Sequence, residues 1–300
     1  MTPLSFPLDW GARTFVMGVL NITPDSFSGD GLLRQGDPAE TAFEQARQFV
    51  ADGAHILDIG GESTRPGAQP VTAPEEIERV VPVIRTLVEH KIDALISVDT
   101  SKAKVAEAAI QAGADWINDV RGLHGDPEMA DVAAHYRVPI VLMHNRLKVA
   151  EVAFEPQLGG HYLGAHYDHL VQEVKADLLE SVALANKAGI SAENIILDPG
   201  IGFGKTVAQS LDLLNRLDEL CSLGYPLLVG PSRKSFIGFT LNLPPDRRIE
   251  GTAAAVAISI ARGADIIRVH DVAFMSRVAQ MTDAIVRRSK GNQAGDGGKT

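Results

Sequence analysis

The chain has 300 residues, of which 45% are hydrophobic, and its formal net charge is −10. An acidic chain lacks the basic face that nucleic-acid binding needs, and its longest apolar window falls short of the roughly 20 residues of a membrane span. The N-terminus has no basic region followed by a long apolar stretch, so we expect no secretory signal. The single cysteine, Cys221, excludes an internal disulfide, and we expect it to be a small buried side chain in a cytoplasmic protein.

Eight short apolar runs recur along the chain, and each ends abruptly in polar, chemically capable residues. They span Phe15–Asn21, Ile56–Arg65, Leu95–Thr100, Trp116–Asp119, Ile140–His144, Ile195–Gly200, Leu227–Lys234 and Ile266–Asp271. Apolar runs without alternation are typical of strands buried on both faces, as in parallel sheets.

Helical patterns fill the gaps between these strands. Ser101 is predicted to cap a helix whose apolar side carries Val105 and Ala109. A longer helix is predicted from about Gly164 to Gly189, with an apolar stripe of Val171, Val174, Leu178 and Val182.

The strict alternation of eight strands with helices predicts an α/β fold, a single (β/α)8 TIM barrel. A barrel of this kind takes about 250 residues, so we expect one domain over residues 1–290 and a disordered tail over 291–300. A short hairpin from Leu4 to Trp10 is expected to plug the barrel floor. In a closed barrel the polar strand ends gather on one rim, and that rim carries the catalytic groups.

Three segments have the composition and length of loops on this rim: residues 22–38, 62–74 and 145–161. The glycine-rich segment Asp198–Thr206 matches neither a P-loop nor a dinucleotide fingerprint, because Pro199 and Lys205 stand where glycine is needed. We interpret it as a flexible strand-end loop that places Asp198 and Phe203 at the rim.

Asp99 and Asp198 end different strands and would both face the barrel mouth. Either aspartate alone could be a helix cap. Together with Asn118 they form a group of acceptors that suits a flat heterocycle with several N–H donors along one edge.

Basic residues follow the last two strands. Lys234 could form a Schiff base, as in barrel aldolases, or donate a hydrogen bond to a ring carbonyl. Arg268 and His270 are alternate residues of one strand and point to the same side. With Asn21 they could hold an anion and a metal ion, although Arg268 could instead serve a structural salt bridge.

These motifs together resemble the dihydropteroate synthase family. The segments that carry the resemblance are Met17–Ser28, Gly60–Gly67, Ser97–Thr100, Ile117–Asp119, Asp198–Lys205, Gly230–Ser235 and Arg268–Asp271, and they follow the family's order. The similarity covers about Leu8 to Arg288. In one departure, the first loop reads Ser28-Gly29-Asp30-Gly31, so its acid is displaced by one residue relative to the family pattern.

The resemblance implies that a dihydropterin bearing a CH₂-diphosphate condenses with p-aminobenzoate in a reaction that requires Mg²⁺. It implies catalytic roles for Asp99, Asp198, Lys234 and Arg268. The pterin would be bound by Asp99, Asn118, Asp198 and Lys234, and the diphosphate by Asn21, Arg268 and His270, with Asn21 acting through the metal. The p-aminobenzoate pocket would be framed by Phe27, Thr64, Arg65, Pro66, Phe203 and Ser235.

The family also implies a homodimer. Sulfonamides mimic p-aminobenzoate, and whether they inhibit depends on the placement of Phe27, Thr64, Pro66 and the loop around Ser235. One rival interpretation is a pterin-binding methyltransferase barrel, which would not need the motifs at residues 21–28 and 232–235. Two others are an aldolase that uses Lys234 and a non-catalytic relative that only binds a partner.

Overall fold

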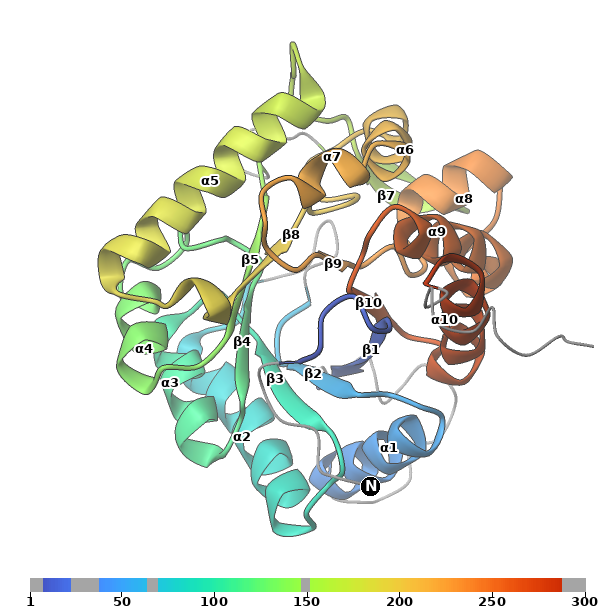
Figure 1. Ribbon diagram of the computed structural model, residues 1–300. Helices are drawn as coiled ribbons and strands as arrows, with labels where there is room; N and C mark the ends of the chain where they lie inside the picture. Colours follow the sequence, from blue (N-terminus) through green and yellow to red (C-terminus); the bar gives the residue numbers. More distant parts are fainter. Residues whose placement is uncertain (1–7, 23–37, 64–69, 147–151, 288–300) are drawn as a thin grey trace, which may run out of the picture.

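The computed structural model describes residues 8–22, 38–63, 70–146 and 152–287 (Figure 1). Its main sheet has eight strands: β1 (Phe15–Asn21), β2 (Ile56–Gly60), β3 (Leu95–Asp99), β4 (Trp116–Asp119), β5 (Ile140–Met143), β8 (Ile195–Asp198), β9 (Leu228–Val229) and β10 (Ile266–Val269). The helices are α1 (Pro38–Ala51), α2 (Ala73–Glu89), α3 (Ala103–Ala112), α4 (Met129–Tyr136), α5 (Leu170–Ala188), α6 (Val207–Asn215), α7 (Asp218–Cys221), α8 (Ser235–Leu241), α9 (Ile249–Ala261) and α10 (Val272–Val286). Short 3₁₀ turns lie at Ala192–Asn194 and Pro245–Arg247.

The eight strands form a closed parallel barrel. Their order is β8-β5-β4-β3-β2-β1-β10-β9, and every neighbouring pair is parallel. A parallel bridge between Leu197 and Leu227 joins the two outer strands and closes the ring. The predicted (β/α)8 architecture and all eight predicted strands are therefore confirmed.

Alternation along the strands separates two apolar clusters. Inward residues at the beginnings of the strands, among them Phe15, Trp116 and Leu228, form the barrel floor. Outward residues such as Val16 and Ile117 pack beneath the helices. Because successive side chains of a strand point to opposite faces, the same strands supply both clusters.

The segment before β1 reaches the floor, as predicted. Leu8 is buried in the floor cluster and Trp10 packs against it. The described residues 8–14 form a turn and contain no strand, while residues 1–7 of the predicted hairpin lie outside the described chain. The predicted tail at 291–300 lies outside it as well.

Two helix predictions meet different outcomes. On α5 the predicted stripe from Val171 to Val182 is buried. The predicted cap of α3 is wrong, because the N-cap position is Lys102 and its side chain makes no capping bond. Asp126 caps α3 from a distant loop instead: its Oδ2 accepts from the Ala103 N–H at 2.9 Å.

An antiparallel hairpin, β6 (Val152–Glu155) and β7 (Gly159–Tyr162), occupies much of the segment predicted as a loop over 145–161. The buried Arg248 guanidinium ties its turn to the barrel by donating to the Leu158 carbonyl at 2.8 Å. Cys221 is exposed, so the expectation of a buried cysteine is wrong. No helix in the described ranges has the length and apolarity required to cross a membrane.

Candidate active site

Strand register collects polar residues at the barrel mouth. Asn21 pairs with Gly60, Gly60 with Asp99, and Asp99 with Asn118, so these four positions lie at one level near the ends of their strands. In each strand these residues lie an even number of positions beyond a floor residue, and they therefore point inward. Asp99 and Asn118 are buried.

Arg268 lies at the centre of this group. Its Nε donates to Asp58 Oδ2 at 2.6 Å, and its Nη2 donates to Asp99 Oδ2 at 2.6 Å. Asn118 Nδ2 donates to the same Asp58 oxygen at 3.0 Å. Two carboxylates thus share one guanidinium, which stays one-fifth exposed toward the mouth.

Asp58 is a residue of this cluster that the sequence motifs did not predict. The side chain is fully buried, and its Oδ1 has no hydrogen-bond partner among the described residues. The available signal was a charged residue in the middle of the apolar run Ile56–Gly60, two positions beyond the floor residue Ile56 and therefore on its face.

Burial sets the electrostatics of the cluster. It raises the pKa of Asp99 to about 7, an effect that Arg268 opposes and Asp58 reinforces. Burial also acts on Arg268, but Asp58 and Asp99 outweigh it and raise the pKa of the guanidinium above its usual range. The mouth therefore combines a permanent cation with a carboxyl group whose ionisation responds to ligands near neutral pH.

Asp198 and Lys234 line another side of the mouth. Burial raises the pKa of Asp198, while Lys234 and the Gly200 N–H oppose the shift. Burial lowers the pKa of Lys234 to about 8, and Asp198 opposes that change. The Lys234 ammonium donates to the Ile201 carbonyl and lies 4.3 Å from the centre of the Phe203 ring. The structure thus brings three predicted site residues together.

The position of Lys234 depends on its neighbour Arg233, which has a left-handed backbone with φ of +58°. Its N–H donates to Thr252 Oγ1 at 3.1 Å, and its carbonyl accepts from Arg248 at 2.9 Å. Its side chain forms an ion pair with Asp271. These contacts fix the turn that presents Lys234 and places Ser235 at the first position of α8.

His270 directly follows β10, two residues beyond Arg268. Its Nδ1 lies 3.0 Å from Ser232 Oγ, and the same hydroxyl accepts from the His270 N–H at 3.2 Å. Ser232, which was not among the predicted site residues, therefore orients the imidazole at the mouth. The alternation predicted for Arg268 and His270 holds.

Four residues predicted to frame the p-aminobenzoate pocket, Phe27, Thr64, Arg65 and Pro66, lie outside the described residues, as does Asp30. The described ends of the second loop are joined by Glu62, whose Oε1 accepts from the Val71 N–H at 3.2 Å. The Lys102 ammonium bridges Glu62 and the buried Glu76. A clamp of charged residues thus holds the two ends of this loop together.

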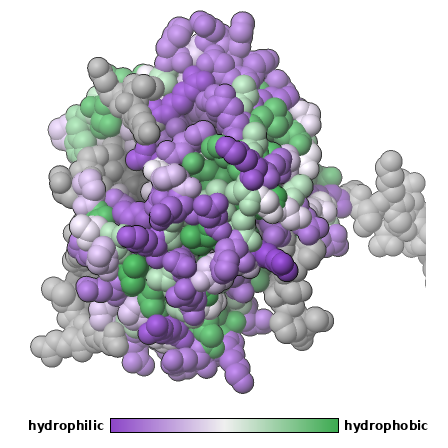
Figure 2. Space-filling model, turned by 90° about the vertical axis from the view of Figure 1, so that its left-hand side faces the viewer, coloured by the Kyte–Doolittle hydropathy of each residue, from purple (hydrophilic) through white to green (hydrophobic). Residues whose placement is uncertain are grey.

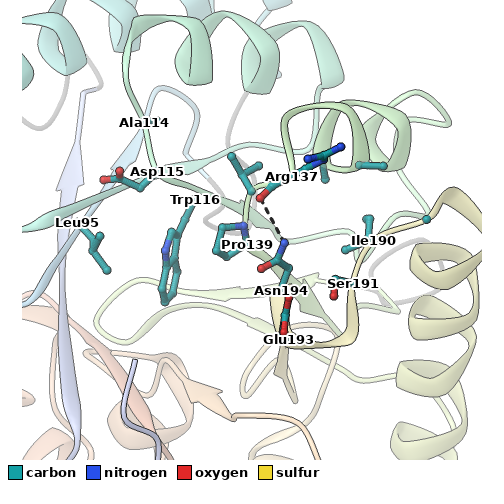
Figure 3. A pocket seen from close by; sticks show the side chains of 14 residues that line it. Leu95, Ala114, Asp115, Trp116, Arg137, Pro139, Ile190, Ser191, Glu193 and Asn194 are labelled. Atoms are coloured by element: carbon teal, nitrogen blue, oxygen red, sulfur yellow. Dashed lines mark hydrogen bonds between the residues drawn. The ribbon is translucent and has the colours of Figure 1, made fainter. Parts of the chain in front are cut away.

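A cavity of about 830 Å³ lies at the opposite end of the barrel. Figure 3 shows it between the beginnings of the strands, with Trp116, Pro139 and Asn194 in its lining and a hydrogen bond from Asn194 to the Arg137 carbonyl. In barrels of this type catalytic groups lie at the carboxyl ends of the strands. We therefore place the candidate site at the mouth.

Comparison with known proteins identifies the family. Residues 17–270 match a family described as pterin binding enzyme. The chain is 48% identical over 281 residues to the dihydropteroate synthase of Bacillus subtilis, covering 94% of this chain and 92% of that one.

The chain belongs to the dihydropteroate synthase family.

Solved structures of the family agree with the fold. A dihydropteroate synthase from Clostridium difficile, crystallised in the presence of pteroic acid, has a TM-score of 0.84 and 43% identity, covering 94% of this chain and all of that one. The Yersinia pestis dihydropteroate synthase in complex with a sulfonamide drug has a TM-score of 0.82 and 40% identity, and the match covers 95% of this chain and 98% of that one. Membership in this family favours the synthase over the methyltransferase and aldolase alternatives.

Proposed function

We propose that this chain condenses 6-hydroxymethyl-7,8-dihydropterin diphosphate with p-aminobenzoate, giving 7,8-dihydropteroate and diphosphate in folate biosynthesis. The main support is the Arg268 cluster at the barrel mouth. A relative named dihydropteroate synthase matches the chain over 92% of its own length. The net charge of −10 and the lone cysteine further support a cytoplasmic enzyme with small-molecule partners.

The pterin would lie against Asp99, Asn118, Asp198 and Lys234. A pterin ring presents N–H donors along one edge, and buried carboxylates accept such bonds strongly. Asp99 and Asp198 face this region from different strands, while Lys234 supplies a donor for the ring carbonyl. Ligand N–H groups would also favour the ionised form of the buried carboxyls.

The diphosphate would be bound by Asn21, Arg268 and His270. The described residues contain no group of three or more His, Cys, Asp or Glu side chains that could hold a metal by themselves. Mg²⁺ usually binds through few protein oxygens together with substrate phosphates and water, so the Asn21 amide oxygen at the mouth fits this donor set. Bound Mg²⁺ would neutralise charge on the diphosphate.

The p-aminobenzoate would lie beside Phe203 and Ser235. The Phe203 ring, already in contact with the Lys234 ammonium, offers an apolar face for the aromatic ring. Phe27, Thr64, Arg65 and Pro66 complete this pocket in the proposal on the strength of the family motifs alone.

The reaction suits a dissociative, SN1-like path. The C–O bond breaks and its electron pair leaves with the diphosphate, while the electron-rich dihydropterin delocalises the positive charge. Arg268 would stabilise the departing charge, and Asp99 and Asp198 would stabilise the cationic ring. The aromatic amine, already neutral at pH 7, forms the C–N bond and releases a proton, so no general base is required.

The decisive experiment measures labelled dihydropteroate formed from the pterin diphosphate, labelled p-aminobenzoate and Mg²⁺. We expect product that disappears with EDTA and returns with added Mg²⁺. A sulfonamide should compete with p-aminobenzoate and not with the pterin substrate. A folded protein that binds pterin and forms no product would contradict the proposal.

We also propose a homodimer formed through α9 and α10. The sequence of α9 is apolar on nearly all sides, which is typical of a helix buried all round. Yet this region exposes Ile258 at 49%, Met281 at 63% and Ile285 at 61%. Figure 1 shows α8, α9 and α10 side by side on one flank of the barrel. On another flank, in Figure 2, hydrophobic and hydrophilic side chains are interspersed.

Sedimentation would test this dimer. Ile258→Glu should shift the protein toward the monomer. Leu179→Glu provides a matched control on α5, where a leucine is 46% exposed, and should leave the mass unchanged. A monomeric wild-type protein at micromolar concentration would contradict the dimer.

A further inference from the structure

Lys205 is a lysine buried beneath the loop that follows β8. Only 3% of the residue is exposed. Its ammonium donates to His144 Nδ1 at 2.9 Å, to the Gly200 carbonyl at 3.0 Å and to the Phe203 carbonyl at 3.3 Å. All three acceptors are neutral, whereas buried lysines usually pair with a carboxylate. The Gly200 carbonyl also accepts from the Phe203 N–H at 3.0 Å, so Lys205 adds its contacts to a turn that the backbone already forms.

The histidine acceptor is itself held in place from the other side. His144 Nε2 lies 2.9 Å from Asp177 Oδ2, and Arg146 donates to both oxygens of that carboxylate. Burial, reinforced by Lys205, lowers the pKa of His144 to about 4, so the ring is neutral at physiological pH. A proton on Nε2 then faces Asp177, and the Nδ1 lone pair faces Lys205.

The loop held by Lys205 carries residues of the candidate site. Gly200, Gly202 and Gly204 all have positive φ angles, and a side chain at Gly200 would lie 2.0 Å from the His144 carbonyl oxygen. Phe203 belongs to this loop, and the Ile201 carbonyl accepts from Lys234 at the mouth. The segment interpreted from sequence as a flexible loop is thus tied by Lys205 on one side and Lys234 on the other.

Lys205 also acts on Asp198 through its charge. The groups facing Asp198 are Lys234, Lys205 and Arg268, and those facing Lys205 are Asp198, Lys234, Arg146, Asp177 and His144. Burial raises the pKa of Asp198, and the nearby Lys205 charge opposes this rise. Burial lowers the pKa of Lys205 to about 7, so the lysine is charged in mildly acidic solution, where Asp198 needs the support.

We propose that Lys205 is a positioning residue of the active site, which fixes the Phe203 loop from below and supports the ionised form of Asp198. The effect of Lys205 on p-aminobenzoate and pterin binding rests on the proposed function. Its stabilisation of the loop is independent of that function.

The first test is hydrogen exchange of the ligand-free enzyme across residues 199–204. Lys205→Met keeps the length of the side chain and removes the charge and the donors. We expect exchange in this segment to increase on the order of tenfold or more, while distant strands stay protected. Lys175→Met is the matched control: this half-buried lysine of α5 donates to Ser222 Oγ at 2.8 Å, and its loss should not change exchange across residues 199–204.

The second test is steady-state kinetics across pH. In Lys205→Met, kcat/KM for p-aminobenzoate should fall about ten- to a hundredfold, mainly through KM, because Phe203 is no longer held. The acidic limit of pterin binding should move to higher pH by on the order of half to one unit, because Asp198 loses a nearby cation. A merely structural role would leave that limit in place.

The outcomes separate the two claims. Wild-type protein that forms no dihydropteroate, with increased loop exchange in the variant, would overturn the proposed function and leave the loop clamp standing. Unchanged exchange and kinetics in a folded variant would overturn the role of Lys205. If Lys205→Met does not fold, Lys205→Gln replaces it, and failure of both to fold would show that Lys205 serves the core rather than the site.

Discussion

The floor and the mouth of the barrel are built by the same strands with the same alternation, yet they differ in every chemical respect. In β3, the inward residue Leu95 belongs to the apolar floor, whereas Asp99, four positions later, forms an ion pair with Arg268. β10 changes from Ile266 to Arg268 within two positions. In both strands the inward residue is apolar near the beginning and charged near the end.

Because of this difference, residues that stabilise the fold lie at the floor of the barrel, and residues that carry the chemistry lie at its mouth. Floor residues gain by leaving water, and their contribution depends on volume and packing. The buried charges of the mouth cost solvation, which their partners offset only in part, and such charges are weak sources of stability. The two ends should therefore respond oppositely to substitution, and four changes test this from the largest expected effect to the smallest.

Phe15→Ala should cause the largest loss of stability. Phe15 is 2% exposed and packs edge-on against Trp10 and His55. Removing a buried phenylalanine ring typically costs about 3–5 kcal/mol of unfolding free energy. We expect urea unfolding to show this loss while kcat of the folded fraction stays within about twofold. A tenfold drop in kcat would mean that the floor is not separate from the chemistry.

Asp198→Asn should do the reverse. The amide keeps the shape and removes the charge facing the pterin, so turnover should fall at least tenfold, and by about 10²–10³ if the contact forms in the transition state. The midpoint of thermal unfolding should change little. Near-normal turnover would remove Asp198 from the pterin site.

Asp99→Asn tests how much unfolding free energy the protein loses by burying an ionised carboxylate at the mouth. Burial raises the folded-state pKa of Asp99 to about 7 from an ordinary 3.8, so between these values the folded protein retains a proton that the unfolded chain releases. The contribution of Asp99 to the free energy of unfolding of the wild type therefore falls as pH rises from about 4 to 7, and it stays constant above pH 7. Relative to wild type, the variant should gain unfolding free energy across that window. A difference in urea unfolding that does not change with pH would contradict this assignment.

Thr206→Ala should have the smallest effect. Thr206 and Gln209 form a capping box at the start of α6, next to Lys205. Loss of the cap should cost about 1 kcal/mol of unfolding free energy with no change in kcat. An activity loss without a stability loss would show that residues near the mouth cannot be assigned by their contacts alone.

Most of the fold could be predicted from sequence patterns, because eight strands that alternate with helices are typical of a closed barrel. Eight apolar runs and the polar residues after them located Asp99, Asp198, Arg268 and the face they share. Helix caps were less accessible: Ser101 has the right chemistry for α3, but Asp126 caps that helix from 23 residues away. A bond of that kind depends on tertiary structure.

The residues that sequence reasoning missed lie beneath the site. Asp58 interrupts an apolar strand, and its role appears only when Arg268, 210 residues later, lies beside it. Lys205 belongs to the glycine-rich segment Asp198–Thr206, which resembles a phosphate-binding loop only superficially. Its partner His144 lies at the end of a different strand. Local spacing reveals groups that face a ligand, whereas groups that hold those residues are defined by distant neighbours.

The pairing of β1 with β10 has a consequence for the order in which the protein forms during synthesis. Asp58 and Asp99 leave the ribosome long before Arg268, which follows them by 210 and 169 residues. Until the last strand arrives, β1 and β9 present unpaired edges, and the two carboxylates must stay hydrated because the cation that they share, Arg268, is missing. Insertion of β10 closes the ring and brings the guanidinium that both carboxylates contact. A nascent chain therefore becomes a barrel and acquires a binding site at the same moment.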